Sequence, residues 1–217
     1  MAARAAEWRW VGDRALLREF SAADLARANE AARNLYRELL AQRFPEIEDV
    51  IPAARSVLVL LRSCGAPAPA LLSLLEESGR AAEASRGEAS LHELDVSYGG
   101  EQGPDLAEVA RAHGIDERTV VALHSAATYT VAFLGFSPGF AYLIGLPAEL
   151  ATPRLATPRT RVPAGSVAIG GEFTAVYPRA TPGGWRLVGQ SAVSLFDPTA
   201  DPPSRLQPGD RVRFVPR

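Results

Sequence analysis

The chain has 217 residues and a formal net charge of −2 at pH 7, and all 23 of its basic residues are arginines. The absence of lysine excludes a Schiff-base or pyridoxal-phosphate lysine and a phosphate-binding loop of the GxxxxGK[ST] type. With 47% hydrophobic residues and one cysteine, we expect one large or two small soluble domains without a disulfide framework. Cys64 follows an apolar run and is predicted to be a buried small hydrophobic residue.

The sequence also bears on location and on large partners. Charged residues are spread through the first twenty positions, so we expect no signal peptide. The longest apolar run, Val57 to Leu61, is too short to span a bilayer. We therefore expect a cytoplasmic protein with no membrane partner, and the absence of a stripe of aromatic and basic residues predicts no nucleic-acid partner.

Residues 1–88 are expected to form a small α+β domain with a ferredoxin-like layout. Ser21 is the predicted helix cap, and apolar residues then recur at helical spacing up to Phe44. Strands that alternate with two helices favour helices packed on one face of a sheet. The expected elements are a hairpin over 8–11 and 15–20, a helix from 21 to 44, strands over 47–51 and 57–61, and a helix over about 67–84.

Residues 89–217 are expected to form a mainly-β barrel domain. After a strand and two short helices, the second capped by Asp116, the sequence becomes rich in glycine and proline with short β-rich runs. That pattern is typical of a compact β-barrel. The expected elements are a strand over 91–98, helices over 104–112 and 116–124, and strands over 167–169, 174–177, 185–188 and 211–215.

Arginine is concentrated in the last third of the chain. From Leu150 onward nine arginines accompany four acidic residues, a net charge of +5, which leaves −7 for the first 149 residues. Arg154, Arg159 and Arg161 lie in a proline-rich loop, and the planar guanidinium matches carboxylate or phosphate. We hypothesise that Arg159 and Arg161 bind such an anion. The alternative is that these arginines tie the loop to the barrel through carbonyl groups.

Other polar and aromatic residues are candidates for the site. His124, at the end of a predicted helix, is a candidate general acid or base, or else a histidine that interacts with the last helix carbonyls. Tyr142, Tyr177 and Trp185 are expected to line a groove or, alternatively, to form barrel core. Ser166 is a candidate hydrogen-bond donor to an anion.

Two further chemistries are disfavoured. Residues 135–139 match the GxSxG motif of serine hydrolases, but the oxyanion hole of that motif needs the backbone N–H after the serine, and Pro138 has none. All three histidines also precede Ser137, contrary to the chain order of such enzymes. Scattered histidines without a carboxylate at ligand spacing predict no bound metal.

A series of ordered motifs resembles the B-subunit family of the bacterial 5-oxoprolinase complex. Members are also called allophanate hydrolase subunit 1, and the family includes the sporulation kinase inhibitor. The motifs are GFSPGFAYL at 135–143, LATPRLATPRTRVPAGSVAI at 150–169, TPGGW at 181–185 and LQPGDRVRF at 206–214. Two positions depart from the family pattern: Ala141 replaces a usual proline, and Gln190-Ser191-Ala192 replaces a usual Arg-Thr-Pro.

The resemblance implies a cyclophilin-like barrel that works with a sister subunit of the same cyclophilin-like fold and with a third, lactam-binding subunit. In that complex ATP hydrolysis drives the opening of 5-oxo-L-proline to L-glutamate. Because this chain lacks a phosphate-binding loop, we expect any nucleotide site on a partner or between subunits, and no activity from the chain alone. Two other functions stay open: inhibition of a sensor histidine kinase, and half of a biotin-dependent carboxyltransferase acting on urea or a similar amide.

Overall fold

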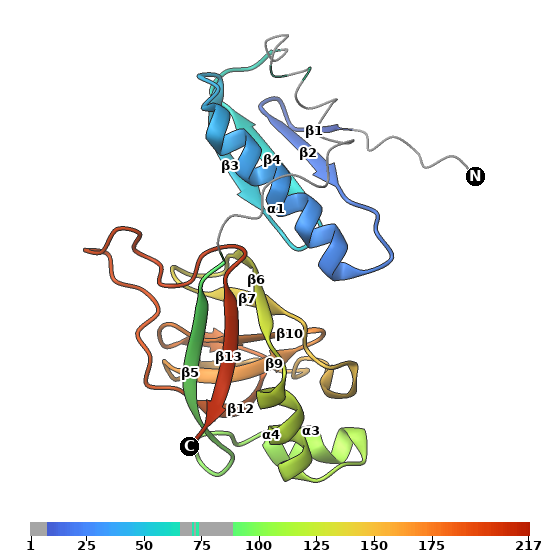
Figure 1. Cartoon of the computed structure of the whole chain (residues 1–217), viewed down its shortest axis with the longest axis vertical. Helices are drawn as coiled ribbons and strands as arrows, with labels where there is room; N and C mark the ends of the chain where they lie inside the picture. Colours follow the sequence, from blue (N-terminus) through green and yellow to red (C-terminus); the bar gives the residue numbers. More distant parts are fainter. Residues whose placement is uncertain (1–7, 66–70, 72, 74–88) are drawn as a thin grey trace. The chain divides into compact units, whose positions relative to one another are not determined.

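The computed structural model describes residues 8–65, 71, 73 and 89–217, and the chain divides into two compact units, Met1–Glu88 and Ala89–Arg217 (Figure 1). In the first unit the described strands form an antiparallel sheet in the spatial order β1-β2-β4-β3. These strands are β1 (Arg9–Val11), β2 (Ala15–Glu19), β3 (Ile47–Pro52) and β4 (Ser56–Leu61). Because β4 pairs antiparallel with both β2 and β3, those two strands run parallel to each other on either side of it.

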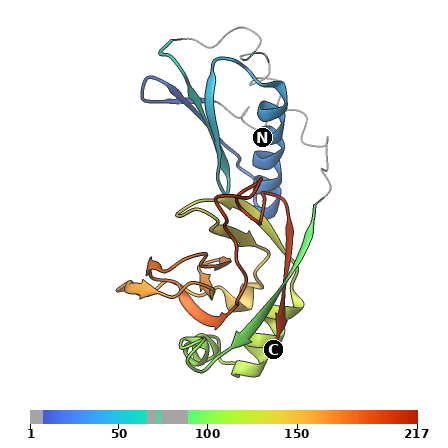
Figure 2. The same ribbon diagram turned by 90° about the vertical axis from the view of Figure 1, so that its left-hand side faces the viewer.

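Helix α1 (Leu25–Gln42) covers one face of this sheet and packs against β3 and β4 (Figure 2). Its buried stripe includes Ala28, Ala32, Leu35 and Leu39, at the spacing of an amphipathic helix. The helix is capped by Asp24, whose carboxylate accepts a hydrogen bond from the Ala26 N–H, and not by Ser21 as predicted. The predicted second helix falls outside the described residues except at positions 71 and 73, so the ferredoxin-like layout stays a prediction.

The predicted burial of Cys64 is wrong. Its side chain is exposed, and its thiol lies 3.2 Å from the Asp13 carboxylate. The apolar strand β4 ends at Leu61, so Cys64 lies in the turn that follows it. The apolar run before the cysteine therefore does not extend far enough to bury it.

The second unit contains a closed barrel with the spatial order β10-β7-β6-β13-β5-β12-β9, which confirms the predicted mainly-β barrel domain. Strand β13 pairs parallel with β5 from Arg211↔Leu91 to Pro216↔Val96, and the other barrel pairs are antiparallel. The barrel strands are β5 (Leu91–Tyr98), β6 (Tyr129–Leu134), β7 (Ala141–Ile144), β9 (Ser166–Gly170), β10 (Phe173–Val176), β12 (Arg186–Gln190) and β13 (Arg211–Pro216).

Helices and a strand pair accompany the barrel. Helices α3 (Leu106–His113) and α4 (Glu117–Ala126) pack on each other, and the short 3₁₀ helix η1 (Ala148–Leu150) contacts both. Strands β8 (Arg159–Val162) and β11 (Thr181–Gly183) form a separate antiparallel pair, which we call the ribbon. Arg159 and Arg161 therefore lie in a strand of the ribbon, and Arg154 lies in the loop before it.

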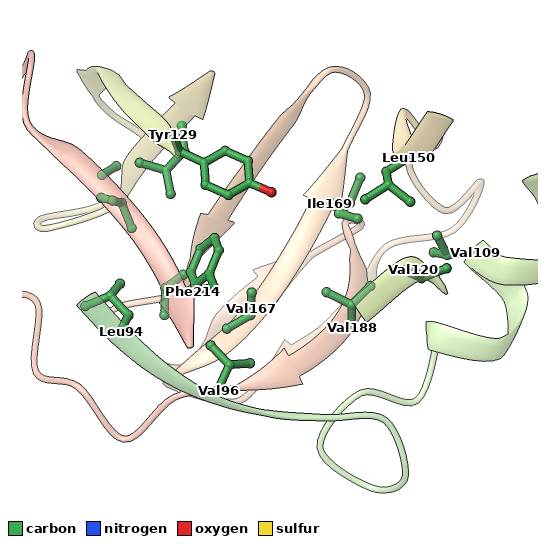
Figure 3. Packing of buried hydrophobic residues seen from close by; sticks show 14 of the residues in the cluster. Leu94, Val96, Val109, Val120, Tyr129, Leu150, Val167, Ile169, Val188 and Phe214 are labelled. Atoms are coloured by element: carbon green, nitrogen blue, oxygen red, sulfur yellow. The ribbon is translucent and has the colours of Figure 1, made fainter. Parts of the chain in front are cut away.

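The barrel interior is filled by one cluster of buried apolar side chains (Figure 3). Leu94, Val96, Val167, Val188 and Phe214 are among them, and all five are at most 1% exposed. These residues come from strands far apart in the sequence, so the interior core joins the two ends of the unit. A rigid barrel of this kind fixes the positions of the side chains on its outer face.

Candidate functional site

A second buried cluster lies on the outer face of the barrel wall. Along β9, Val167 and Ile169 belong to the interior core, whereas Ala168 belongs to the second cluster. Side chains alternate between the two faces of a strand, so Ala168 points outward. We call this second set the outer cluster; it consists of Phe140, Val162, Ala168, Ala175, Tyr177, Trp185 and Leu187, with Tyr142 and Phe173 packed against it.

Aromatic rings dominate the outer cluster and hold one another in place. The Phe140 ring is edge-on to the rings of Tyr142, Tyr177 and Trp185, with centroid distances of 5.0, 5.2 and 5.6 Å. Edge-to-face pairs of this kind are favourable because the positive edge of one ring meets the negative face of the other. The three aromatic residues predicted to line a groove or form core are thus brought together. Tyr177 and Trp185 are buried, and Tyr142 is half-buried.

Phe136 extends this aromatic surface to solvent. Its side chain is 60% exposed, and its backbone has a φ of 67°, in the left-handed region that non-glycine residues rarely adopt. The turn around it is closed by a hydrogen bond from the Gly135 N–H to the Phe140 carbonyl. Its ring contacts Phe140 and Tyr177 edge-on. The turn therefore holds an exposed aromatic ring in a strained conformation beside the outer cluster.

The ribbon contributes polar groups to the cluster. Val162, opposite Thr181 in the strand pair, is fully buried in the outer cluster, so the Thr181 side chain faces the same way. The Thr181 hydroxyl is buried and has no hydrogen-bond partner among the described residues. An unpaired buried hydroxyl costs stability unless a water or a ligand bonds it.

Arg154 lies over the indole of Trp185, with 5.5 Å between the guanidinium carbon and the ring centroid. Burial raises the pKa of the Tyr142 and Tyr177 hydroxyls, and the positive charge of Arg154 opposes the rise at both. A hydrogen bond from the Trp185 backbone and the charge of Arg159 also oppose the rise at Tyr177. Two arginines thus act on one tyrosine hydroxyl.

Arg159 is anchored by a buried acid. Its Nη2 donates to Asp105 Oδ1 at 2.7 Å, while Asp105 Oδ2 accepts from the Leu187 backbone N–H at 2.7 Å. Asp105 is 5% exposed, and its carboxylate makes no cap for α3 although it stands at the N-terminus of that helix. The second guanidinium nitrogen, Arg159 Nη1, is buried and has no partner in the described part of the chain. The arginine therefore ties the ribbon to the barrel and keeps one donor unused.

Two predicted residues lie at the margin of this site. Arg161 is exposed and neighbours the inward-facing Val162, so it lies on the opposite face of the ribbon. Ser166 is buried in β9, where its carbonyl accepts from the Tyr177 N–H at 2.9 Å. Gln190, which replaces a usual arginine, donates its side-chain amide to the Ala164 carbonyl. An anion-binding role for Arg161 or Ser166 stays a prediction.

His124 lies away from the outer cluster, in the barrel interior. It is fully buried, and its ring stacks on Phe214 at 4.6 Å. The Thr174 hydroxyl donates to the Ala168 carbonyl, so it accepts from His124 Nε2–H at 3.0 Å, and Nδ1 accepts from the Tyr98 hydroxyl at 2.7 Å.

Desolvation lowers the pKa of His124 to about 3. A neutral ring with both nitrogens bonded to protein groups favours a structural role. A catalytic role for His124 stays a prediction that its surroundings do not support.

Sequence reasoning missed Asp105, Phe136 and Thr181. Asp105 precedes an apolar helix and so has the pattern of an ordinary helix cap, and nothing local distinguishes a cap from an anchor for a distant arginine. The described residues contain no group of three or more His, Cys, Asp or Glu side chains placed to hold a metal ion. Within the same residues, no helix combines the length and apolar character needed to cross a membrane.

Comparisons with known proteins agree with one family. The family described as "Carboxyltransferase domain, subdomain C and D" matches residues 6–206. The chain is 50% identical over 181 residues to the 5-oxoprolinase B-subunit of Escherichia coli O157:H7, covering 82% of this chain and 83% of that one. It is 36% identical over 216 residues to the 5-oxoprolinase B-subunit of Bacillus subtilis (strain 168), covering 94% and 90%.

Among solved structures, TTHA0988 is similar with a TM-score of 0.80 and 36% sequence identity. The match covers 94% of this chain but 40% of that chain. This chain therefore corresponds to two fifths of a longer polypeptide.

Proposed function

The chain belongs to the carboxyltransferase subdomain C and D family, which includes the 5-oxoprolinase B-subunit, and from this membership we propose that it is part of an ATP-dependent 5-oxoprolinase complex. The reaction is the opening of 5-oxo-L-proline to L-glutamate. The observation that carries the proposal is the 50% identity to a 5-oxoprolinase B-subunit over 82% of the chain.

The chemistry explains why ATP is needed. A lactam is a stable amide, and transfer of the γ-phosphoryl group of ATP to the lactam oxygen forms an O–P bond and releases ADP. Water then adds to the activated carbon, the ring C–N bond breaks, and phosphate leaves, so that ATP and water are consumed for each glutamate. Intermediates on this route are anionic, and preorganised cations stabilise such charge. Arg154 and Arg159 of the outer cluster supply cations of this kind.

The chain acts with partners in this proposal. A sister barrel subunit and a lactam-binding subunit complete the complex, and the match to two fifths of the longer TTHA0988 chain supports a partner of comparable size. The sequence has no lysine and no phosphate-binding loop, so the nucleotide binds on a partner or between subunits. The chain alone is inactive.

The test is reconstitution. The chain is co-expressed with the sister and lactam-binding subunits, and glutamate release from 5-oxo-L-proline is followed with and without ATP. We expect release only with ATP and all three subunits, and a preparation that omits this chain is the control. Absence of turnover, together with tight binding to a sensor histidine kinase or biotin-dependent carboxylation of urea, contradicts the proposal.

A further inference from the structure

The strongest unused feature of the outer cluster is the divided guanidinium of Arg159. One arm, Nη2, is fixed by the buried Asp105 carboxylate, which is itself fixed by the Leu187 N–H. The other arm, Nη1, is buried without a partner among the residues described. A charged donor held in one orientation and left unpaired is prepared to bind an oxyanion, because a new charge-assisted hydrogen bond removes its unsatisfied state.

Other groups converge on the same place. The charges of Arg159 and Arg154 both act on the Tyr177 hydroxyl, so both guanidinium groups lie near it. Thr181 is the second buried polar group without a partner in the described ribbon, and it faces the outer cluster. Trp185 lies beneath Arg154 and closes the set with a flat apolar surface.

We propose that Asp105 positions Arg159 so that its Nη1, together with Arg154, binds the oxyanion of a small ligand beside Tyr177, Thr181 and Trp185. The ligand class is a carboxylate or a phosphate. Its identification as 5-oxo-L-proline or as phosphate released from ATP rests on the proposed function. Asp105 acts through Arg159 and is a positioning residue, whereas Arg154 and Arg159 touch the ligand. Arg161 has no part in the site because it lies on the other face of the ribbon.

Binding is measured on the full chain by fluorine NMR after incorporation of 5-fluorotryptophan. The resonance of Trp185 is assigned by its loss in Trp185→Phe, and inorganic phosphate and 5-oxo-L-proline are titrated separately. We expect a saturable shift of the Trp185 resonance with at least one of these anions. Arg154→Gln and Thr181→Val are each expected to weaken binding by about tenfold or more, the effect of losing one hydrogen bond to a charged group. Arg111→Gln, the same change on the exposed surface of α3, leaves binding unchanged.

The positioning role of Asp105 is tested by a pair of variants. Arg159→Lys keeps the positive charge and one bond to Asp105 but removes the second arm, and Asp105→Asn removes the anchor. We expect both to weaken anion binding about tenfold, and the double variant to weaken it no further, because both act on the same donor. Thermal unfolding of each variant shows that the fold is kept. Additive losses, or unchanged binding in Arg159→Lys, would overturn the positioning role.

The two anion titrations and the reconstituted complex separate the site from the proposed function. Saturable binding of phosphate, lost in Arg154→Gln, supports the site even if the reconstituted complex releases no glutamate. Turnover by the complex with no saturable Trp185 shift from either anion overturns the site and leaves the proposed function standing. Unchanged binding in Arg154→Gln also overturns the site.

Discussion

Neutral His124 illustrates how a residue typical of active sites becomes part of a core. Its two ring nitrogens are bonded to Tyr98 and Thr174, and the Tyr129 hydroxyl donates to its backbone carbonyl at 2.8 Å. Four residues from separate elements are thereby joined through one imidazole. The bonds require the neutral ring, because a protonated imidazole has no acceptor for the Tyr98 hydroxyl.

This arrangement makes stability depend on pH. The folded-state pKa of His124 is lowered to about 3, below the value of about 6.5 expected in the unfolded chain, so the unfolded state binds the proton first. The contribution of His124 is complete above pH 6.5 and is lost as pH falls toward 3. Between pH 6.5 and 4.5 we expect it to cost about 2–3 kcal/mol of unfolding free energy. Urea unfolding at several pH values measures this loss.

The matched variant is His124→Gln, whose amide donates to Thr174 and accepts from Tyr98 without titrating. We expect it to be less stable at pH 7 but to lose about 2–3 kcal/mol less than the natural chain between pH 6.5 and 4.5. Other histidines and carboxylates contribute equally to both proteins. Parallel pH profiles for the two proteins would show that His124 is not the group responsible.

At the scale of elements, the turn before β9 is packed against the loop after β12. Gly165 has a φ of 80°, and a Cβ added there would lie 2.1 Å from the Ser191 carbonyl oxygen. The backbones are joined by a hydrogen bond from the Ser191 N–H to the Gly165 carbonyl at 2.8 Å. This contact seats residues 190–192, where the sequence departs from the family pattern, directly against the turn.

Gly165→Ala is therefore expected to destabilise the protein more than Gly171→Ala. Gly171 also has a positive φ, 64°, but a Cβ there meets nothing within 4 Å. Both substitutions incur the left-handed penalty of about 1–2 kcal/mol, and the backbone clash at Gly165 adds about 1–3 kcal/mol more. Urea unfolding of the two variants measures the difference. Equal losses would mean that the loop after β12 moves away freely.

Elements were more predictable from the sequence than their arrangement. The predicted runs over 91–98 and 211–215 coincide with β5 and β13, because β-branched and apolar residues alternate there. Their parallel pairing was not predictable, since it joins residues 120 positions apart, as in Arg213 with Glu93. Strands β6, β7, β8 and β11 are additional to the predicted runs.

The candidate site was predictable in its residue types but not in its geometry. Arginine, tyrosine and tryptophan indicated an anion site with aromatic walls, and the structure brings Arg154, Tyr142, Tyr177 and Trp185 together. Which face of a strand points outward depends on the barrel's closure, and that depends on distant pairings. The outer cluster and its buried anchor therefore had no local signal.

At the scale of the whole molecule, the second unit contains every strand partner that its barrel needs. The circuit closes through the β9–β10 pair, and its core residues all lie between Leu94 and Phe214. A fragment of residues 89–217 is expected to fold alone and to unfold cooperatively, with a near-ultraviolet dichroism signal from Trp185. A fragment of residues 89–208, which lacks β13 and Phe214, is expected to lose that transition. A non-cooperative 89–217 fragment would show that the barrel needs the first unit.

The parallel pairing of β5 with β13 also sets a timetable for synthesis. The pair Leu91 and Arg211 is separated by 120 positions. A ribosome adds about 5–20 residues per second, so β5 emerges roughly 6–24 s before the strand that lies beside it. Its other neighbour, β12, also arrives late, since Tyr98 pairs with Gly189. During that interval both edges of a largely apolar strand are unpaired, and the growing chain depends on chaperones or on rapid completion to avoid aggregation.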